Sequence, residues 1–532
     1  MSKSKTVVTQ AALDEHILSF VINEGMPSTI VRSESFKELV LLGLPGKKVM
    51  CYQTLQKKLA EEFETMKNRL RERMIQPAYI CITADCWTAG RRGFIGVTAH
   101  WLEEDLSRSS VVLACKRIKG RHTYDVLARY LEEILQDYGI QNKTVGAVTD
   151  SGSNFVKAFS LFQDLDILSP SSDASRSEED RDEDEDQEIQ YHDVEELLDS
   201  PGEAIFRLPP HHKCAAHKLN LVASVDSLAA ASEDNHFKKI SRAALAKASQ
   251  LWNKQSRSSL ASDLIHDQIG CLFTVPCDTR WNSMFMSMQK LALVLREKED
   301  RVQSVMDRLG LPRFNDRDKL FIREYVQVMQ HCAKALNVLQ GEKSSYLGCL
   351  LPVISGVRKK LEDEKENLTV CSSLCDALLA GVQKRFESER NDKRALIAAV
   401  IHPRFKVSWL DTEEEKLRAW EALRSELGHE SSDSLQAEGL SEEDDEMDFF
   451  CPKQGSDSSD VLEEYKSTGV TRIDQLSNFP ALKNLFVKYN TTLPSSASVE
   501  RLFSHGGGLF RKNRYSLKDE NFERQLLLKL NK

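Results

Sequence analysis

The spacing of apolar residues changes near Pro77, from a helical pattern before it to strand-like segments after it, and this change restricts the fold class of the chain. Before it, apolar side chains recur every three or four residues, which marks one face of a helix; they are Leu59, Phe63, Met66, Leu70 and Met74. Pro77 ends this helix because proline has no amide hydrogen to donate. After it, the short apolar segments 78–85, 93–102 and 110–118 are typical of strands. The chain therefore combines helical and sheet-forming regions.

The order of the following elements indicates the kind of sheet. Residues 124–138 have the pattern of an amphipathic helix, and residues 144–149 form a fourth apolar segment. Three strands, a helix and a further strand are the opening order of an RNase H-like sheet. We therefore predict an α/β fold with an RNase H-like core, in which Asp85 ends the first strand and Asp150 follows the fourth.

Asp85 and Asp150 are the first candidates for catalysis. Cleavage of a DNA backbone uses two divalent cations about 4 Å apart, and carboxylates on neighbouring strands can hold them because the sheet fixes their spacing. A structural role is an equal alternative for each residue. Asp150 would then cap the next helix or form an Asx turn, and Asp85 would form a turn at the end of its strand.

Charge is unevenly distributed along the 532 residues. The net charge is −9, yet residues 170–203 contain 15 acidic and 2 basic side chains, and residues 430–460 contain 11 and 1. Subtracting the net charges of these segments, −13 and −10, leaves +14 on the rest. Residues 170–203 and 429–460 offer too little apolar surface to order themselves, so we predict two acidic disordered loops. The basic remainder favours binding to a polyanion.

A chain of this length needs more than one hydrophobic core. We predict a helical N-terminal region over residues 1–75, the first part of the core over 76–225, and a large all-helical insertion over 227–478. Within the insertion, one helix face is marked by Phe321, Tyr325, Val328, Cys332, Leu336 and Leu339.

Composition also excludes several classes of protein. No apolar run is long enough to span a membrane, and the first residues do not resemble a signal peptide, so we expect a soluble, non-secreted protein. The 12 cysteines contain no CxxC pair, which favours reduced thiols over a disulfide framework.

Five short motifs occur in an order that is specific to one family. They are ADCWT, TDSGSNFVKA, CAAHKLNL, DTRWNSM and SSASVERLFS. With them the chain resembles the hAT transposases, the family of hobo, Ac and Tam3, from about residue 10 to residue 530. The resemblance is greatest to the vertebrate domesticated members that usually carry an N-terminal BED zinc finger.

The resemblance implies a catalytic triad of Asp85, Asp150 and Glu500. Glu500 would lie on a helix that returns to the core after the insertion, and the three carboxylates would hold Mg²⁺ or Mn²⁺. The alternative for Glu500 is a solvated helical glutamate paired with Arg501 or another cation. Residues 480–532 would contain this helix and the dimerisation region of the family.

The resemblance also implies contacts with DNA. His217 would help to position the backbone, Trp281 would stack on an exposed base, and Arg280 and Arg501 would lie beside the DNA. A packed core position is an equal alternative for Trp281. The CxxH spacing of Cys214 and His217 could suit zinc, but no second ligand pair is near, so we expect a buried cysteine and a polar active-site histidine.

The last helix carries an apolar face formed by Phe522, Leu526, Leu527 and Leu530. A terminal helix that buries nothing in its own domain would expose this face, so we predict pairing with a second chain, as a homodimer or higher oligomer. Packing onto the chain's own core is the alternative.

The two cysteines and two histidines of a BED finger do not occur before Asp85. We therefore expect no zinc finger, and only electrostatic, sequence-independent binding of DNA. The expected partners are DNA and a second copy of the chain, with no membrane and no small-molecule substrate, in the nucleus. One hypothesis is a metal-dependent DNA transposase. The other is a domesticated, non-catalytic regulator associated with DNA or chromatin.

Overall fold

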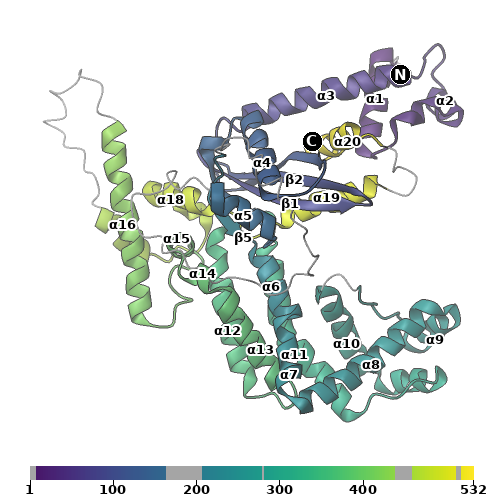
Figure 1. The fold of residues 1–532 in the computed structure, drawn as a ribbon, viewed down its shortest axis with the longest axis vertical. Coiled ribbons are helices and arrows are strands. Elements are labelled where there is room, and N and C mark those ends of the chain that lie inside the picture. Colours follow the sequence, from purple (N-terminus) through teal and green to yellow (C-terminus); the bar gives the residue numbers. More distant parts are fainter. Residues whose placement is uncertain (1–7, 163–205, 278–280, 438–457, 511–516) are drawn as a thin grey trace, which may run out of the picture. The chain divides into compact units, whose positions relative to one another are not determined.

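The chain folds into two compact units. The structure is a computed structural model and describes residues 8–162, 206–277, 281–437, 458–510 and 517–532 (Figure 1). Unit 1 comprises residues 1–99, 110–212 and 499–532, and unit 2 comprises residues 100–109 and 213–498. The predicted loop over 170–203 lies outside the described residues.

Unit 1 is built on a five-stranded sheet with the strand order β3-β2-β1-β4-β5. The strands are β1 (Ile80–Ala89), β2 (Arg92–Leu102), β3 (Arg108–Ile118), β4 (Thr144–Thr149) and β5 (His211–Lys213). β1 and β4 are parallel, with Thr83 opposite Val148. The predicted mixed α/β class is confirmed.

β1 is longer than predicted. We expected it to end at Asp85, but it continues to Ala89, so Asp85 lies inside the strand. Gly90 then adopts the left-handed conformation, with a φ of 64°, which lets the chain reverse sharply into β2. Consecutive strands joined by so short a turn run antiparallel.

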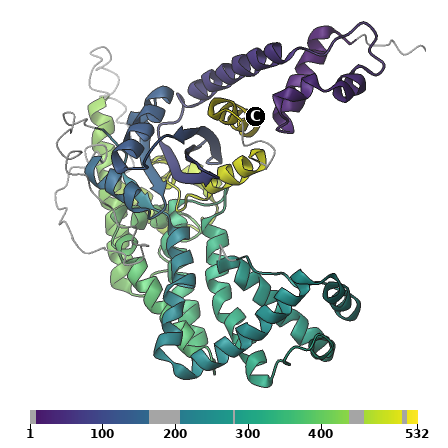
Figure 2. The same ribbon diagram turned by 45° about the vertical axis from the view of Figure 1, so that its right-hand side comes forward.

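Helices pack on the sheet of unit 1 in both views of the ribbon (Figures 1 and 2). They are α4 (Tyr124–Tyr138), α5 (Ser153–Phe162), α19 (Ala497–Leu509) and α20 (Asp519–Leu530). α4 forms because its apolar residues share one face, which is buried; they are Leu127, Leu131, Ile134, Leu135 and Tyr138. α19, from the far end of the sequence, runs along β1 and β2.

Residues before the sheet are helical in their described part, which begins at Val8. The elements are α1 (Gln10–Asn23), η1 (Ser28–Arg32), α2 (Glu34–Leu41) and α3 (Tyr52–Arg73). The apolar face of α3 is buried at Leu59, Met66 and Leu70. α1 and α3 both contact α20, so the two ends of the chain share one core in unit 1.

Unit 2 is helical throughout its described residues, apart from the strand ends that it shares with unit 1. The longer helices are α6 (Ala215–Ser224), α8 (Asn235–Arg257), α9 (Ser259–Ile269), α10 (Trp281–Arg308), α11 (Asp316–Leu339), α12 (Leu350–Lys365), α13 (Ser372–Arg385), α15 (Lys393–Ile401), α16 (Glu413–Ala437), α17 (Ser458–Ser467) and α18 (Pro480–Asn490). In α11 the predicted face is buried at Phe321, Val328, Cys332, Leu336 and Leu339.

The boundaries of the helical unit differ from those of the predicted insertion. α6 belongs to unit 2 because it packs against α11 and α13, and α18 belongs there because it packs against α15. The predicted loop over 429–460 is helical at both of its ends that the structure describes. Residues 429–437 continue α16 and residues 458–460 begin α17, whereas 438–457 lie outside the described residues. Of the helices in the described ranges, none has the length and apolar character that crossing a membrane requires.

Candidate active site

Asp85 is presented by the middle of β1. Alternate residues of a strand point to the same face, so Asp85 shares its face with Thr83 and Trp87. The hydroxyl oxygen of Thr83 lies 2.6 Å from that of Thr98 on β2. Asp85 is half-buried, and its Oδ1 accepts a hydrogen bond of 2.7 Å from the amide of Cys86.

Asp150 lies beside Asp85 because β1 and β4 are parallel neighbours. Thr83 is opposite Val148, and two residues further along each chain stand Asp85 and Asp150. Oδ1 of Asp150 accepts a hydrogen bond of 3.1 Å from the amide of Gly152, directly before α5 begins. The structural role that was the alternative for Asp150, an Asx turn at a helix start, is therefore present.

Glu500 reaches unit 1 on α19, and close packing holds this helix against the sheet. A Cβ atom on Gly96 of β2 would lie 2.6 Å from the ring of Phe503 and 2.8 Å from Val499, so only glycine allows α19 to approach so closely. Trp87 stacks on Phe503 with 5.6 Å between ring centroids. Glu500 stands three residues before Phe503, and residues at this spacing share a helix face.

An aromatic cluster continues this contact away from the carboxylates. Phe94, Phe510 and Phe522 surround Trp87, and the rings of Phe510 and Phe522 are 4.2 Å apart between centroids. Pairs of this kind contribute about 0.5–1.5 kcal/mol beyond their area burial. The cluster joins β1, β2, α19 and α20 and so fixes the position of α19 on the sheet.

The three carboxylates affect one another electrostatically. Burial first, then the negative charge of Asp150 and, more weakly, that of Glu500, raise the pKa of Asp85 to about 7. The hydrogen bond from the Cys86 amide acts in the opposite direction. Burial and the charges of both aspartates also raise the pKa of the Cys86 thiol to about 12, so this thiol stays protonated.

The donor chemistry of this group fits Mg²⁺ or Mn²⁺, which prefer carboxylate oxygens. A cation would also relieve the repulsion that raises the pKa of Asp85. Within the described ranges, however, no three His, Cys, Asp or Glu side chains stand at the spacing of metal ligands. Asp85 and Asp150 each hold a backbone amide through one oxygen. Metal binding would require these side chains to turn toward a shared ion.

The predicted DNA contacts are not gathered with the carboxylates in one unit. His217 lies in the first turn of α6 in unit 2, and Arg280 lies outside the described residues. Trp281 begins α10 in unit 2 and stacks on Phe285, 5.8 Å between centroids. Arg501 is half-buried beside Glu500 on α19 in unit 1. The roles of these four residues in binding DNA stay predictions.

Cys214 is buried, as predicted. Its sulfur accepts hydrogen bonds from the amide of His217, at 3.4 Å, and from the amide of Ser496, at 3.3 Å. The thiol therefore caps the start of α6 and joins it to the segment that leads into α19, all within unit 2.

The predicted dimerisation face is not exposed. Phe522, Leu526 and Leu527 are at most 1% exposed, and Leu530 is half-buried. α20 packs against α1 and α3, and Phe522 also enters the aromatic cluster. The expectation that this face would be left uncovered is wrong, because the N-terminal helices of the same chain cover it.

One group of charged residues was missed by the sequence reasoning. Arg91, Arg117, Lys119 and Arg121 meet at the end of the β2–β3 hairpin. The signal was present in GRRGF and CKRIKGRH, two basic stretches at the start and the end of successive predicted strands. Antiparallel pairing brings such stretches together.

Part of unit 1 matches a known domain family. Residues 83–170, which include Asp85 and Asp150, match the family described as the ZBED1 RNase-like domain. The chain is 26% identical over 277 residues to a putative AC transposase of Zea mays, covering 51% of this chain and 29% of that protein. A putative AC9 transposase of Zea mays matches at 26% over 277 residues, 51% of this chain and 28% of that one.

A further relative is a putative transcriptional regulator, tpeD, of Talaromyces stipitatus. It is 26% identical over 154 residues, which cover 28% of this chain and 18% of that protein. The chain thus spans less than a third of the length of each of these curated relatives. Together with the sheet of unit 1, the matches show an RNase-like domain and a similarity of the chain to hAT-type, ZBED-like proteins.

Proposed function

We propose that unit 1 cleaves DNA strands and transfers them, with Asp85, Asp150 and Glu500 as the ligands of divalent cations. One observation carries the proposal: burial and then the charges of Asp150, after β4, and more weakly of Glu500, on α19, raise the pKa of Asp85 on β1. Clustered, repelling carboxylates are costly for a fold, and perturbed pKa values of this kind are concentrated at functional sites.

The side chains divide the work as follows. Asp85 and Asp150 would supply oxygen ligands from neighbouring strands, and Glu500 would supply a third from α19. A cation held at this place would favour the charged carboxylate of Asp85, whose pKa is raised in its absence. Bound Mg²⁺ or Mn²⁺ would stabilise the charges on the attacking and leaving oxygens of the phosphodiester. The close packing at Gly96 and Trp87 keeps Glu500 over the strands.

The test is cleavage of a DNA duplex that carries hAT-type ends. Wild-type protein with Mg²⁺ or Mn²⁺ is expected to nick the duplex and join strands, and Glu500→Gln, which keeps the size of the side chain, is expected to lose this activity. A matched control is Glu520→Gln, an exposed acid on the first turn of α20. Equal cleavage by wild type and Glu500→Gln would refute the proposal.

A second candidate function is a non-catalytic regulator that binds DNA or chromatin as a dimer. The similarity to a putative transcriptional regulator supports it. In that case Asp85→Ala leaves DNA binding and any self-association, measured by light scattering, as in wild type, and no cleavage occurs with either protein. Both candidate functions imply a nuclear protein, since both act on DNA.

A further inference from the structure

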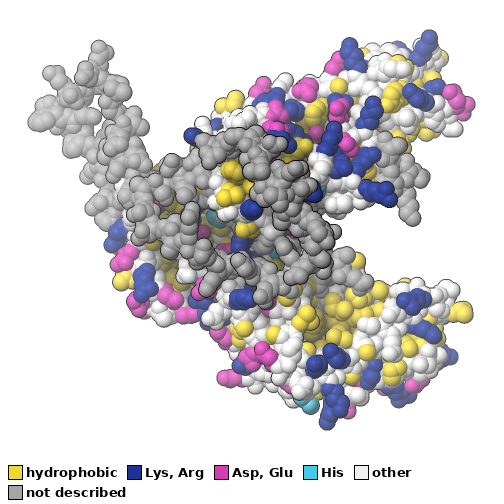
Figure 3. Space-filling model, viewed as in Figure 1, with side chains coloured by type: hydrophobic (Ala, Val, Ile, Leu, Met, Phe, Trp, Pro, Cys, Tyr) yellow, Lys and Arg dark blue, Asp and Glu magenta, His cyan; other side chains and the backbone are white. Residues whose placement is uncertain are grey.

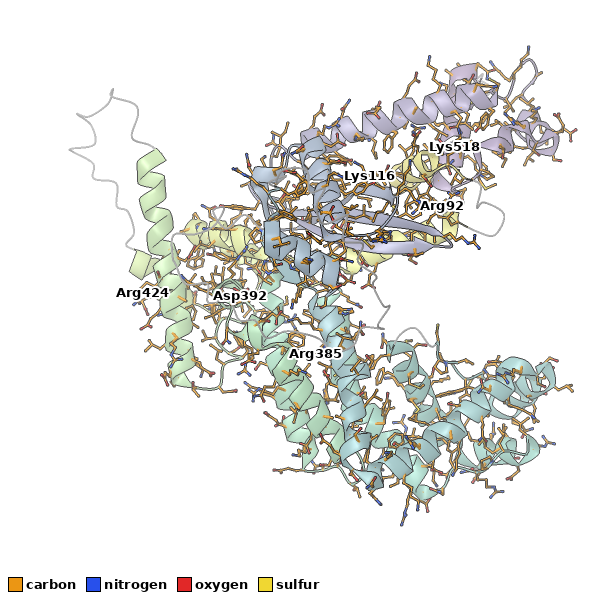
Figure 4. The ribbon with its side chains drawn as sticks, in the orientation of Figure 1. Arg92, Lys116, Arg385, Asp392, Arg424 and Lys518 are labelled. Carbon is orange, nitrogen blue, oxygen red and sulfur yellow. The ribbon has the colours of Figure 1, made fainter. Side chains whose placement is uncertain are left out.

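At the open end of the β2–β3 hairpin in unit 1, opposite the β2–β3 turn, the charged residues of the two strands and of the segments next to them are all basic. Residues 86–99 and 110–122 contain no Asp or Glu and six basic residues, namely Arg91, Arg92, Lys116, Arg117, Lys119 and Arg121. β2 begins where its antiparallel neighbour β3 ends, so these residues gather at one place. Figure 4 shows Arg92 and Lys116 in this part of unit 1, and Figure 3 shows that Lys and Arg side chains are mixed with Asp and Glu over the visible face of the protein.

Arg117 on β3 connects the end of this strand to the β1–β2 turn and the start of β2. Its guanidinium donates hydrogen bonds to the carbonyl oxygens of Gly93 at 2.8 Å, Ile118 at 2.7 Å and Arg91 at 3.3 Å. It also lies over the ring of Phe94, 5.7 Å from the centroid. Arg117 is therefore a structural cation that fixes the β1–β2 turn against the end of β3.

Arg92 is held in a similar way on the other side of the turn. It donates to the carbonyl oxygen of Leu517 at 2.6 Å and forms an ion pair of 3.1 Å with Asp519. Much of its charge is thus offset within unit 1. Neither Arg92 nor Arg117 is a strong candidate for contact with a ligand.

Lys116 is half-buried and lies close enough to Glu523 to interact with its carboxylate, whereas the other three cations face solvent on this fixed support. The loop after β3 folds back on β2. The imidazole of His122 lies so close to Gly93 that a Cβ atom added there would be 2.2 Å from the ring. This brings Lys119 and Arg121 beside the β1–β2 turn, and both are exposed, as is Arg91. Three exposed cations therefore stand on a loop and a turn whose backbones are held together.

This edge is continuous with the candidate active site. The β1–β2 turn follows Ala89, the last residue of β1, and Ala89 lies four residues after Asp85 on the same strand. This separation corresponds to roughly 13 Å along β1. Phosphates on one strand of a duplex rise about 3.4 Å per step, so roughly four steps would cover this distance. The residues between, Cys86 to Ala89, carry no charge that would repel a phosphate.

We propose that Arg91, Lys119 and Arg121 form a phosphate-binding edge that holds the sugar-phosphate backbone of the DNA strand leading to the three carboxylates. The edge recognises charge and spacing without reading bases, since Lys and Arg contacts to phosphate carry no sequence information. The proposal rests on the proposed function for its position on the reaction path. Binding itself can be measured without catalysis.

The test uses the full chain and a short fluorescein-labelled DNA duplex of random sequence, without divalent cations. The triple variant carries Arg91→Gln, Lys119→Gln and Arg121→Gln. The control carries three substitutions at exposed cations on α3 and α8, namely Arg69→Gln, Lys239→Gln and Arg242→Gln. Each phosphate contact contributes about 0.9 to the slope of log affinity against log salt, so the first variant should lose a slope of about 2 to 3 and at least roughly tenfold in affinity. The control should stay close to wild type.

The single variant Lys119→Gln tests the same edge in case the triple variant does not fold. Its salt slope should decrease by roughly one third of the decrease expected for the triple variant. Equal affinities and slopes for the triple variant and the control would overturn the phosphate-binding edge. If the triple variant binds and cuts like wild type, the edge is wrong and the proposed cleavage stands. If wild type binds but never cuts, and the triple variant loses binding, the edge stands and the proposed cleavage is wrong.

Discussion

Asp85 is a destabilising residue in the absence of metal. Its pKa is raised to about 7 by burial and by Asp150 and Glu500, whereas an unfolded aspartate titrates near 3.8. Between these values the folded protein holds a proton that the unfolded chain has lost. The free energy of unfolding therefore falls as the pH rises through this window, in total by a few kcal/mol, and stays low above it.

Asp85→Asn is expected to remove this loss. Compared with wild type by urea unfolding without divalent cations, the variant should be similar in stability near pH 4 and more stable by a few kcal/mol near pH 8. Titratable groups that do not interact with Asp85 cancel in the difference between the two proteins. Parallel stability profiles across the whole pH range would show that the pKa of Asp85 is not raised.

At the residue level, the sequence predicted the two aspartates but not their surroundings. Asp85 and Asp150 follow from strand patterns and motifs. Their meeting with Glu500 depends on α19 returning across 350 residues, which is the difference between positions 500 and 150. No local pattern records such a contact, and only the resemblance pointed to it.

Among the elements, α19 depends on a glycine in the strand beneath it. Gly96→Ala places a methyl group 2.6 Å from Phe503 and 2.8 Å from Val499, so α19 must move away from β2. We expect a loss of about 1–3 kcal/mol in stability. We also expect DNA cleavage to fall further than DNA binding, since Glu500 moves with the helix.

Gly508→Ala on the same helix is the matched control for Gly96→Ala. No atom lies within 4 Å of a Cβ added there, so the change should be neutral or stabilise α19 by up to about 1 kcal/mol. Thermal unfolding and a cleavage assay on both variants measure the difference. Equal effects of the two substitutions would contradict the packing account.

α20 belongs to the core of unit 1. Truncation of its apolar side chains should therefore lower stability, whereas truncation at a dimer interface would lower self-association. Leu526 is fully buried, so Leu526→Ala should cost about 2–5 kcal/mol, seen as a lower unfolding temperature, with no change in molar mass by light scattering. Leu39→Ala, at a leucine 71% exposed, should change little. A variant at Leu526 that keeps its stability but loses self-association would restore the dimer interpretation.

For α20, the sequence predicted the apolar face of the helix but not the elements that pack against it. Periodicity identified its apolar face correctly, but an apolar face does not say which surface covers it. The covering helices, α1 and α3, lie at the other end of the sequence. β1 was also predicted too short, because CWTAGRR lacks the alternation of apolar and polar residues that marks a strand.

For the whole molecule, charge distribution matters more than net charge. Residues 170–203 carry a net −13 and the chain −9, so these residues oppose the attraction of the basic surface for DNA. Replacing their Asp and Glu by Asn and Gln, at unchanged length, should raise DNA affinity at low salt. The gain should shrink as salt screens the charges. Fluorescence anisotropy at several salt concentrations measures it, and unchanged affinity at low salt would contradict this view.

In the proposed function Asp85, Asp150 and Glu500 bind a divalent cation together, although in this structure the three carboxylates are not at the spacing of metal ligands. The most direct test is calorimetric titration of Mn²⁺ into the full chain and into Asp85→Asn, Asp150→Asn and Glu500→Gln. We expect binding by wild type, with release of a proton near pH 7, and weaker binding by at least roughly tenfold in each variant. Equal Mn²⁺ affinity in wild type and Glu500→Gln would contradict the claim.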